Sequence, residues 1–344
     1  MYRKICILLM VLLCLCGCSD KQLEQSYTEG MQALEKEEYD EAIAAFETVI
    51  QGNYRLPETY RAYGIAWLEK ESYPEAIAAF SRSLNEMETT DISFEKDVMY
   101  YLAQARILHG ETEKAQNLYG EILEMDGDLQ AFYLRGKTYL DQNDFENARK
   151  DFMRAIEGCK DYNLYINIYH LYVEKNKVMD GKEFLNLALE IEPETGEDYY
   201  HRGRIFDHQK DYEQAKAALI EALKLEYMDA MPLLGKIYLK MNDVTSARGM
   251  YQEYLSQKVN NARAYNGLAM CDIYEGKYDE ALSNIQKGLA ENNEQENQGL
   301  LFNEIVSYEY KRDFTTAKQK MQEYLSEYPE DVEALRENEF LSTR

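Results

Sequence analysis

Four histidines are the side chains of this 344-residue sequence best suited to acid–base chemistry or metal binding: His109, His170, His201 and His208. No two of them have the His-x-x-x-His spacing, and no two cysteines have the spacing of a zinc site. The sequence also contains no Gly-rich phosphate-binding loop and no Gly-x-Ser-x-Gly elbow. We therefore predict no catalytic residue, no metal ligand and no cofactor, and we interpret the protein as a non-enzyme.

One histidine pair needs a separate interpretation. His201 and His208 are seven residues apart, which places them on the same face of a helix. Two imidazoles on one face could sense pH or bind a metal ion weakly. The interpretation that we favour is that both are exposed polar side chains without a role in a site.

The cysteines predict no disulfide framework. Four of the six lie within the first eighteen residues, which leaves Cys159 and Cys271 in the body of the chain. More than three of the repeats described below separate them, and packed helices advance by roughly 8–10 Å each. A disulfide needs Cα atoms within about 7 Å. We expect no bridge and interpret both as small core residues.

The N-terminus has the features of an export signal. Arg3 and Lys4 precede an apolar run from Ile5 to Leu15 that is too short to cross a bilayer. Residues 15–18, Leu-Cys-Gly-Cys, resemble the lipobox of bacterial lipoproteins, although the family more often has Ala, Ser or Val where Cys16 stands. That resemblance implies removal of residues 1–17 and a lipid on Cys18.

The lipoprotein resemblance predicts a location. Residues 18–22 would be a short lipidated tether, and the protein would be anchored on the extracytoplasmic face of a bacterial cell membrane. The alternative is an uncleaved hydrophobic anchor, which also places the bulk of the chain outside the cytoplasm.

Charge excludes one class of partner. The full chain has a net charge of −25, and without residues 1–17 it has 36 basic and 63 acidic residues, a net charge of −27. A field of this sign repels phosphate, so we expect no nucleic acid as a partner and no anionic-lipid surface. The acidity by itself names no partner.

A repeated small residue organises the rest of the chain. Successive gaps between these residues are 34, 39, 33, 33, 34, 32, 34 and 36. The period is therefore near 34 residues, the length of a tetratricopeptide repeat. The repeated positions are Ala42, Ala76, Ala115, Ala148, Gly181, Ala215, Ala247, Ala281 and Ala317.

Two further positions recur in register with it. A small residue, such as Gly64 or Gly136, stands twelve residues earlier, and a bulky one, such as Phe80 or Phe152, stands four residues later. Small residues allow two antiparallel helices to approach closely, and the bulky residue fills the space beside the next hairpin. This pattern resembles the tetratricopeptide repeat family over about nine units.

The resemblance implies an all-α solenoid in one continuous array, residues 23–330. Residues 331–344 are predicted to form a helix that caps the last hairpin. The predicted units are 23–56, 57–95, 96–128, 129–161, 162–195, 196–227, 228–261, 262–297 and 298–330.

Three places depart from the regular pattern. Tyr169 and Gly181 occupy the two close-contact positions of the fifth unit, so we expect its helices to lie further apart. About five extra residues are expected in the polar stretch Asn85–Lys96. The acidic stretch Glu291–Gly299 predicts a longer connection.

The family resemblance also predicts a binding surface. In tetratricopeptide proteins the first helices of successive hairpins line a concave groove. The resemblance places Lys137, His170, Arg204 and Lys236 on that face of this chain. Four residues earlier on first helices lie Tyr100, Tyr133 and Tyr200, so Tyr133 should lie near Lys137 and Tyr200 near Arg204. The hypothesis is a basic, tyrosine-bearing stripe that binds an acidic or carboxylate-ended partner.

The structural alternative is that these cations pair with neighbouring carboxylates and that the tyrosines, thirty in all, fill the hairpins.

The peptide-carboxylate clamp known in the family is not reproduced, because its Asn positions are not matched around Lys137 or Lys236. Arg135 and Arg202 are interpreted as structural ion-pair residues.

Two functions remain open. The favoured one is a membrane-anchored extracytoplasmic scaffold that binds a protein or peptide partner in a bacterial cell-envelope complex. The alternative is a small-ligand or glycan-binding, or enzyme-accessory, lipoprotein whose tyrosines stack on the ligand. A scaffold predicts an extended open groove, whereas a receptor predicts a closed aromatic pocket.

Overall fold

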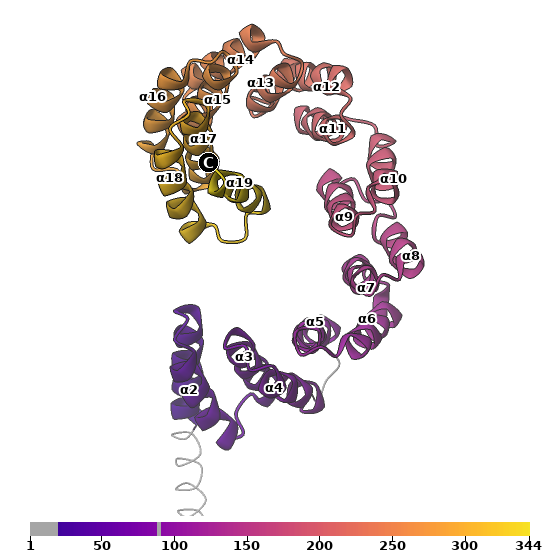
Figure 1. Ribbon diagram of the computed structural model, residues 1–344. Helices are drawn as coiled ribbons and strands as arrows, with labels where there is room; N and C mark the ends of the chain where they lie inside the picture. The colour runs from indigo at the N-terminus through magenta and orange to yellow at the C-terminus, as the bar shows by residue number, and fades with distance from the viewer. Residues whose placement is uncertain (1–19, 88–90) are drawn as a thin grey trace, which may run out of the picture. The chain divides into compact units, whose positions relative to one another are not determined.

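The computed structural model of the protein describes residues 20–87 and 91–344, and within these ranges every regular element is a helix. The predicted signal and the lipid site at Cys18 lie outside the described residues. The chain divides into two compact units, residues 1–159 and 160–344, which are described separately below (Figure 1).

The first unit contains four hairpins in the described residues. Its first helix covers residues 20–35 of the described chain. The others are α2 (Tyr39–Gln51), α3 (Leu56–Glu69), α4 (Tyr73–Asn85), α5 (Ile92–Leu108), α6 (Thr112–Asp126), α7 (Leu129–Asp141) and α8 (Phe145–Ala155).

The second unit contains five hairpins and a terminal helix. Its helices are α9 (Tyr162–Glu174), α10 (Val178–Leu189), α11 (Gly196–Gln209), α12 (Tyr212–Lys224), α13 (Ala230–Lys240), α14 (Val244–Gln257), α15 (Asn261–Tyr274), α16 (Tyr278–Leu289), α17 (Glu294–Tyr310), α18 (Phe314–Glu327) and α19 (Val332–Ser342). The all-α solenoid of tetratricopeptide-like hairpins is thereby confirmed.

Short turns join the two helices of each hairpin. Most turns have three residues, and the middle one adopts a left-handed conformation, as at Glu71 (φ 59°) and Gly276 (φ 73°). An aspartate often follows and caps the second helix: Asp144 accepts a hydrogen bond from the Asn147 amide, and Asp313 accepts one from Thr316. A left-handed residue ends the first helix, and the cap starts the second.

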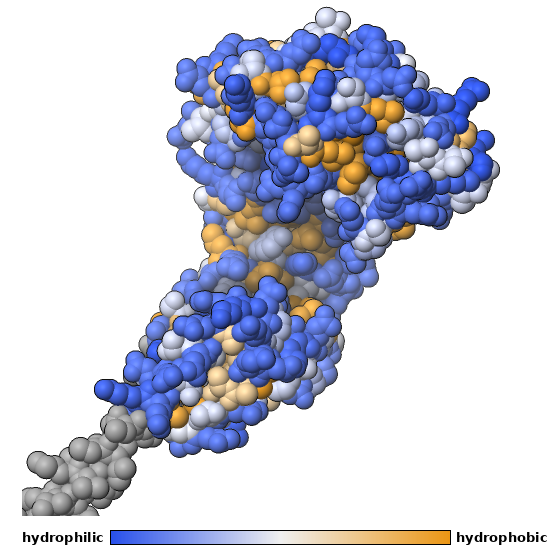
Figure 2. Space-filling view, turned by 90° about the vertical axis from the view of Figure 1, so that its left-hand side faces the viewer, coloured by the Kyte–Doolittle hydropathy of each residue, from blue (hydrophilic) through white to orange (hydrophobic). Residues whose placement is uncertain are grey.

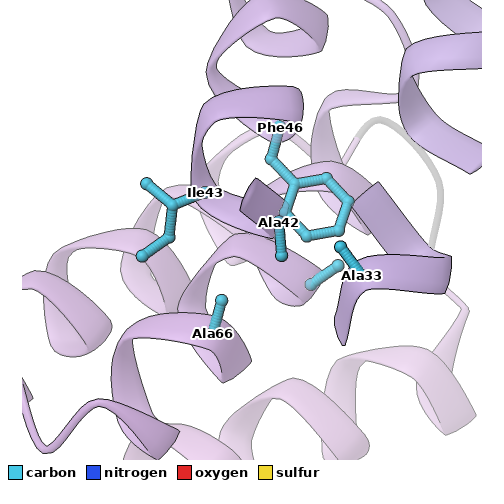
Figure 3. Close-up of a cluster of buried hydrophobic side chains, with 6 residues drawn as sticks. Ala33, Ala42, Ile43, Phe46 and Ala66 are labelled. Atoms are coloured by element: carbon cyan, nitrogen blue, oxygen red, sulfur yellow. The ribbon is translucent and has the colours of Figure 1, made fainter. Parts of the chain in front are cut away.

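The small and bulky positions pack against each other as predicted. A Cβ atom added at Gly64 would lie 2.6 Å from the Phe80 ring, so the ring needs the space that glycine leaves. In the first hairpin, the buried Phe46 packs with Ala33 and Ala42, and Ala66 of the next hairpin belongs to the same cluster (Figure 3). The bulky residue therefore joins its own hairpin to the next one.

The fifth hairpin corrects one prediction. We expected α9 and α10 to lie further apart because Tyr169 is large. Instead, a Cβ atom at Gly181 would lie 3.0 Å from the Tyr169 backbone oxygen and 2.9 Å from the Tyr172 Cβ atom. The small residue on the second helix compensates for the large one on the first, so the helices approach closely.

Two predicted connections are also partly helical. The residues Glu291–Gly299 do not form a long connection, since α17 begins at Glu294 with Asn293 as its N-cap. Acidic residues in the first turn favour a helix start, and for that reason the stretch folds into helix. Of the stretch Asn85–Lys96, Ile92 onward belongs to α5, which has 17 residues.

The terminal helix α19 covers the last hairpin. Its buried residues Ala334 and Leu341 pack with Ile305 of α17 and Met321 of α18. The surface drawn in Figure 2 is mostly hydrophilic, with hydrophobic residues gathered in groups between the hydrophilic ones. None of the helices among residues 20–87 and 91–344 has the length and apolarity needed to cross a membrane.

Candidate functional site

The first helices of neighbouring hairpins lie next to one another. In the second unit, α9 contacts α11, α11 contacts α13, α13 contacts α15 and α15 contacts α17. Figure 1 shows α9, α11 and α13 along one side of this unit and α10 and α12 along the other. Two hollows lie between such first helices: the α5–α7 groove in the first unit and the α15–α17 groove in the second.

The α5–α7 groove has a volume of about 520 Å³, and its lining combines apolar side chains with one cation, Lys137, and two carboxylates, Asp97 and Asp141. Leu108, half exposed, stands at its edge. The one basic residue of the lining is Lys137, which is exposed and has no ion-pair partner among the described residues. The lining residues are Asp97, Tyr100, Tyr101, Gln104, Ile107, Leu108, Tyr119, Gln130, Leu134, Lys137, Thr138 and Asp141.

The two predicted tyrosines of this unit have different positions. Tyr100 lines the groove, and its buried hydroxyl lies beside the carboxylate of Asp128. Burial, and secondly the charge of Asp128, raise the pKa of Tyr100, so the hydroxyl stays protonated. Tyr133 instead places its ring 5.9 Å from the ring of Phe152, between α7 and α8. This ring contact lies within the hairpin, and the expected place of Tyr133 near Lys137 stays a prediction.

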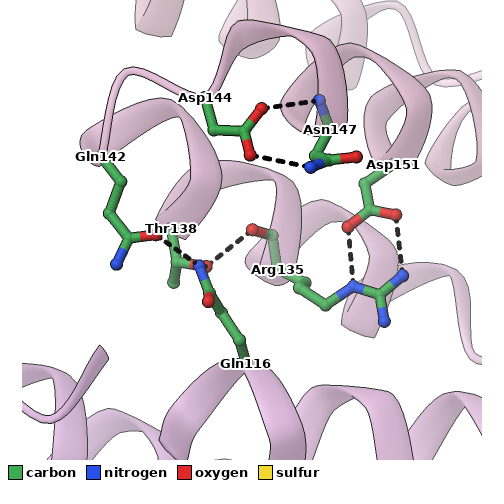
Figure 4. Close-up of polar contacts among 7 residues, drawn as sticks. All are labelled: Gln116, Arg135, Thr138, Gln142, Asp144, Asn147 and Asp151. Atoms are coloured by element: carbon green, nitrogen blue, oxygen red, sulfur yellow. Dashed lines mark hydrogen bonds and ion pairs between the residues drawn. The ribbon is translucent and has the colours of Figure 1, made fainter. Parts of the chain in front are cut away.

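A polar network fixes α7, the helix that carries Lys137. Arg135 donates two hydrogen bonds, of 2.8 and 2.9 Å, to the buried carboxylate of Asp151 on α8. Gln116 of α6 donates to Thr138 of α7 and to Gln142, the C-cap residue of α7 (Figure 4). Arg135 is thus a structural residue, as is Arg202, which donates to two backbone carbonyls at the end of α10. Both were predicted as structural residues.

In the second unit, neighbouring side chains hold one of the predicted basic groups, Arg204, and lower the pKa of another, His170. Arg204 donates to the Asn163 side chain at 2.8 Å and lies 3.1 Å from Nδ1 of His201. His170 is exposed, but partial burial, and secondly Arg204, lower its pKa below the ordinary value. The imidazole of His170 is therefore neutral at pH 7.

The remaining two predicted residues of the second unit are Lys236 and Tyr200. Lys236 of α13 is exposed and has no ion-pair partner among the described residues. Tyr200 packs its ring 5.2 Å from Tyr227 and 5.5 Å from His201 rather than on Arg204. Of the four predicted cations, Lys137, Lys236 and Arg204 thus have no carboxylate partner among the described residues, and of these Arg204 is hydrogen-bonded to a neutral side chain.

The histidine pair corrects another prediction. His201 is not exposed but buried, with its ring stacked on Tyr162 at 5.7 Å. His208 packs against His170, with ring centroids 4.8 Å apart. Burial, and secondly His170, lower the pKa of His208 to about 4. No group of three or more metal-ligating side chains occurs in the described part of the chain.

The α15–α17 groove was not predicted. It has a volume of about 640 Å³ and is lined mainly by tyrosines and small or apolar residues. Tyr278 and Tyr310 stack with centroids 5.6 Å apart and an interplanar angle of 7°. The lining residues are Met270, Ile273, Tyr274, Glu275, Gly276, Tyr278, Asn303, Val306 and Tyr310.

Part of this groove could have been found from the sequence. Met270 and Val306 follow the small-residue position of their first helices and so belong to the predicted inner face. Tyr278 stands three residues before Ala281, at a position that the repeat register did not single out. Tyr274 and Tyr310 stand at the ends of first helices, outside the two positions that the repeat register singled out.

Family models for the tetratricopeptide repeat match several segments of the chain. One model matches residues 27–88 and 233–296, a second matches residues 129–157 and 199–227, and a third matches residues 97–126. These matches fall in both units. Among curated proteins, none matches the sequence.

Solved structures of repeat proteins resemble the chain at low identity. A tetratricopeptide repeat protein from Parabacteroides merdae has 11% identity and a TM-score of 0.45, covering 73% of this chain and 98% of its own. The C-terminal part of a repeat protein from Cytophaga hutchinsonii has 17% identity and a TM-score of 0.45, with 70% and 99% covered. A chain of the APC/C hetero-tetramer Cut9–Hcn1 has 12% identity and a TM-score of 0.42, with 93% and 90% covered.

Proposed function

Because this chain carries tetratricopeptide repeats in both of its units, we propose that it is a scaffold that binds a segment of a protein partner in a groove between first helices. Stacked repeats present extended surfaces suited to such binding. The fold itself hosts many roles, so the proposal rests on the chemistry of the groove. We propose no catalytic activity.

The observation that carries the proposal is the α5–α7 groove with its unpaired Lys137. Asp97 of the same lining is paired with Arg61, so Lys137 is the group in this groove that can attract a carboxylate of a partner segment. An exposed ion pair contributes only about 0–1 kcal/mol, so Lys137 would orient the partner rather than hold it. Burial of Ile107, Leu108 and Leu134 would supply affinity, at about 25 cal/mol per Å² of apolar surface.

The proposed place of action is the extracytoplasmic face of a bacterial membrane, within a cell-envelope complex. Support comes from the sequence: a basic start, an apolar run and the Leu-Cys-Gly-Cys end at Cys18. Helix is present from residue 20 onward in the described chain. A lipid on Cys18 would therefore hold the first hairpin close to the membrane, which favours partners at the same membrane.

Photocrosslinking in native membranes tests the proposal. A photoreactive residue at Gln104, in the groove lining, should form an adduct with a partner protein. The matched control is the same residue at Glu121, which is exposed on the second helix α6. The adduct should depend on Lys137 and fall in yield in Lys137→Glu, with helicity unchanged.

Two outcomes would contradict groove binding: equal adducts from positions 104 and 121, or an adduct at 104 that Lys137→Glu leaves unchanged.

The lipid anchor is tested separately. Cys18→Ala should release the chain from the membrane fraction, and retention of this variant would contradict the lipid anchor.

A further inference from the structure

We propose that the α15–α17 groove binds an uncharged, proline-rich segment in the polyproline II conformation. The inference rests on the proposed function, because it assigns a second class of partner segment to the same scaffold. It concerns residues other than those of the α5–α7 groove and can fail separately.

The first support is the exposed aromatic surface. Tyr274 is 54% exposed and Tyr310 is 60% exposed, so large aromatic faces remain uncovered on either side of the groove. Tyr310 also stacks on Tyr278, which holds its ring in place. Parallel, fixed aromatic rings form the kind of surface on which pyrrolidine rings pack.

The second support is the charge of the lining. Glu275 is its one charged residue, and its carboxylate is paired with Arg248 at 3.1 Å and with Lys277 at 2.6 Å. The groove therefore presents no unbalanced charge, although the whole chain has a net charge of −25. A charged segment would lose hydration here without gaining a partner, so an uncharged occupant is favoured.

The third support is the supply of hydrogen-bond donors. The hydroxyl groups of Tyr274, Tyr278 and Tyr310 have no hydrogen-bond partner among the described residues. The remaining polar side chain, Asn303, donates from Nδ2 to Asn266 at 2.7 Å. The groove thus offers hydroxyl donors to a partner that brings acceptors.

A proline-rich segment matches this combination. Proline has no backbone N–H group, and a polyproline II helix leaves its carbonyl oxygens free to accept. An α-helical segment would already have satisfied most of its carbonyls internally. The segment is also rigid before binding, so it loses little conformational entropy in an open groove.

The test is a binding titration with the whole mature chain. The probe is a fluorescent, end-capped oligoproline of about ten residues, which spans about 31 Å. A capped Gly–Ser peptide of the same length is the matched probe, without rigid apolar rings. The chain should bind oligoproline and not the Gly–Ser peptide.

Three variants locate the binding. Tyr274→Ala with Tyr310→Ala should weaken oligoproline binding by about tenfold or more, as truncation of central aromatic contacts does. The two Phe substitutions at these positions keep the rings and remove the donors, so a smaller, severalfold loss is expected. Phe340→Ala removes a ring of 41% exposure on α19, outside the groove, and should leave binding unchanged.

The inference is overturned if oligoproline binds no more tightly than the Gly–Ser peptide, or if Tyr274→Ala with Tyr310→Ala leaves binding unchanged. Displacement of the probe by a neutral oligosaccharide such as maltohexaose would also overturn it, since the groove would then be a saccharide site. In each case, a Lys137-dependent adduct at Gln104 would show that the proposed scaffold function survives.

Discussion

The α5–α7 and α15–α17 grooves are formed by equivalent elements and yet have opposite chemistry. Each lies between the first helices of two neighbouring hairpins, as the repeat dictates. One contains a lysine without a partner, whereas the other has a neutral lining dominated by stacked tyrosines. The repeat thus fixes where a groove forms, and a few side chains decide what it binds.

The largest expected effect is on stability. It comes from removing a small–bulky contact of the kind that packs the hairpins on which both grooves depend. Phe152 is fully buried against Gly136, so Phe152→Ala should lower the free energy of unfolding by about 3–5 kcal/mol. Urea denaturation measures the loss, with Phe340→Ala as the exposed control. A loss no larger than that of the control would mean that the small–bulky contact does not hold the hairpin.

Removing the ion pair that fixes α7, one wall of the α5–α7 groove, should have the next largest effect on stability. Arg135→Met would leave the buried carboxylate of Asp151 without its cation, at a cost of about 3 kcal/mol. The same denaturation measures it. Replacing Asp151 by Asn in the same chain should restore part of the stability, because the buried charge is then removed as well. Failure of this second change to recover any stability would contradict the ion-pair explanation.

One pH-dependent effect should arise at the end of the second unit. Glu309 of α17 has a buried oxygen without a hydrogen-bond partner and faces Glu337 of α19. Burial, and secondly Glu337, raise the pKa of Glu309 from 4.5 to about 7. The carboxyl group of Glu309 therefore binds its proton more tightly in the folded chain than in the unfolded chain. Its contribution to the free energy of unfolding is fully present below about pH 4.5.

That stability should disappear as the pH rises through about 7. The thermal midpoint of the wild type should therefore fall more between about pH 5 and about pH 8 than that of Glu309→Gln. Glu146→Gln, which changes an exposed carboxylate, serves as the control and should follow the wild type. Parallel curves for the wild type and Glu309→Gln would contradict the raised pKa of Glu309.

The smallest expected effect is a difference in stability between Gln substitutions at Lys137 or Lys236 and the same substitution at Arg204. Single Gln substitutions at Lys137 and Lys236 should leave the free energy of unfolding within about 0.5 kcal/mol, since neither has an ion-pair partner. Arg204→Gln should cost more, because it loses the hydrogen bond to Asn163. Equal losses in all three variants would mean that Arg204 is not held by this contact.

Much of the fold was predictable because it depends on spacing. Gly64, Phe80 and their counterparts recur in register, and steric contact between them requires one hairpin geometry. The fifth hairpin was mispredicted because Gly181 compensates for Tyr169 from the other helix, which a position-by-position comparison of helices does not reveal. The start of α17 was missed because its acidic residues were interpreted as solvated loop rather than as a favourable first turn.

The site was less predictable because side-chain partners are set by packing between hairpins. The repeat register identified Lys137 and Tyr100, which line the α5–α7 groove. It could not show that Arg204 is bound to Asn163, that Tyr133 packs on Phe152, or that His201 is buried. Tyr310 comes next to Tyr278 only through the packing of the last two hairpins.

The contrast between the two grooves is tested most directly by titrating two probes into three chains. The probes are a capped acidic peptide and the capped oligoproline, and the chains are the wild type, Lys137→Glu and the chain with Tyr274→Ala and Tyr310→Ala. We predict a crossed result: Lys137→Glu loses only the acidic peptide, and the double tyrosine variant loses only oligoproline. Loss of both probes in either variant, or of neither in both, would contradict two chemically distinct grooves.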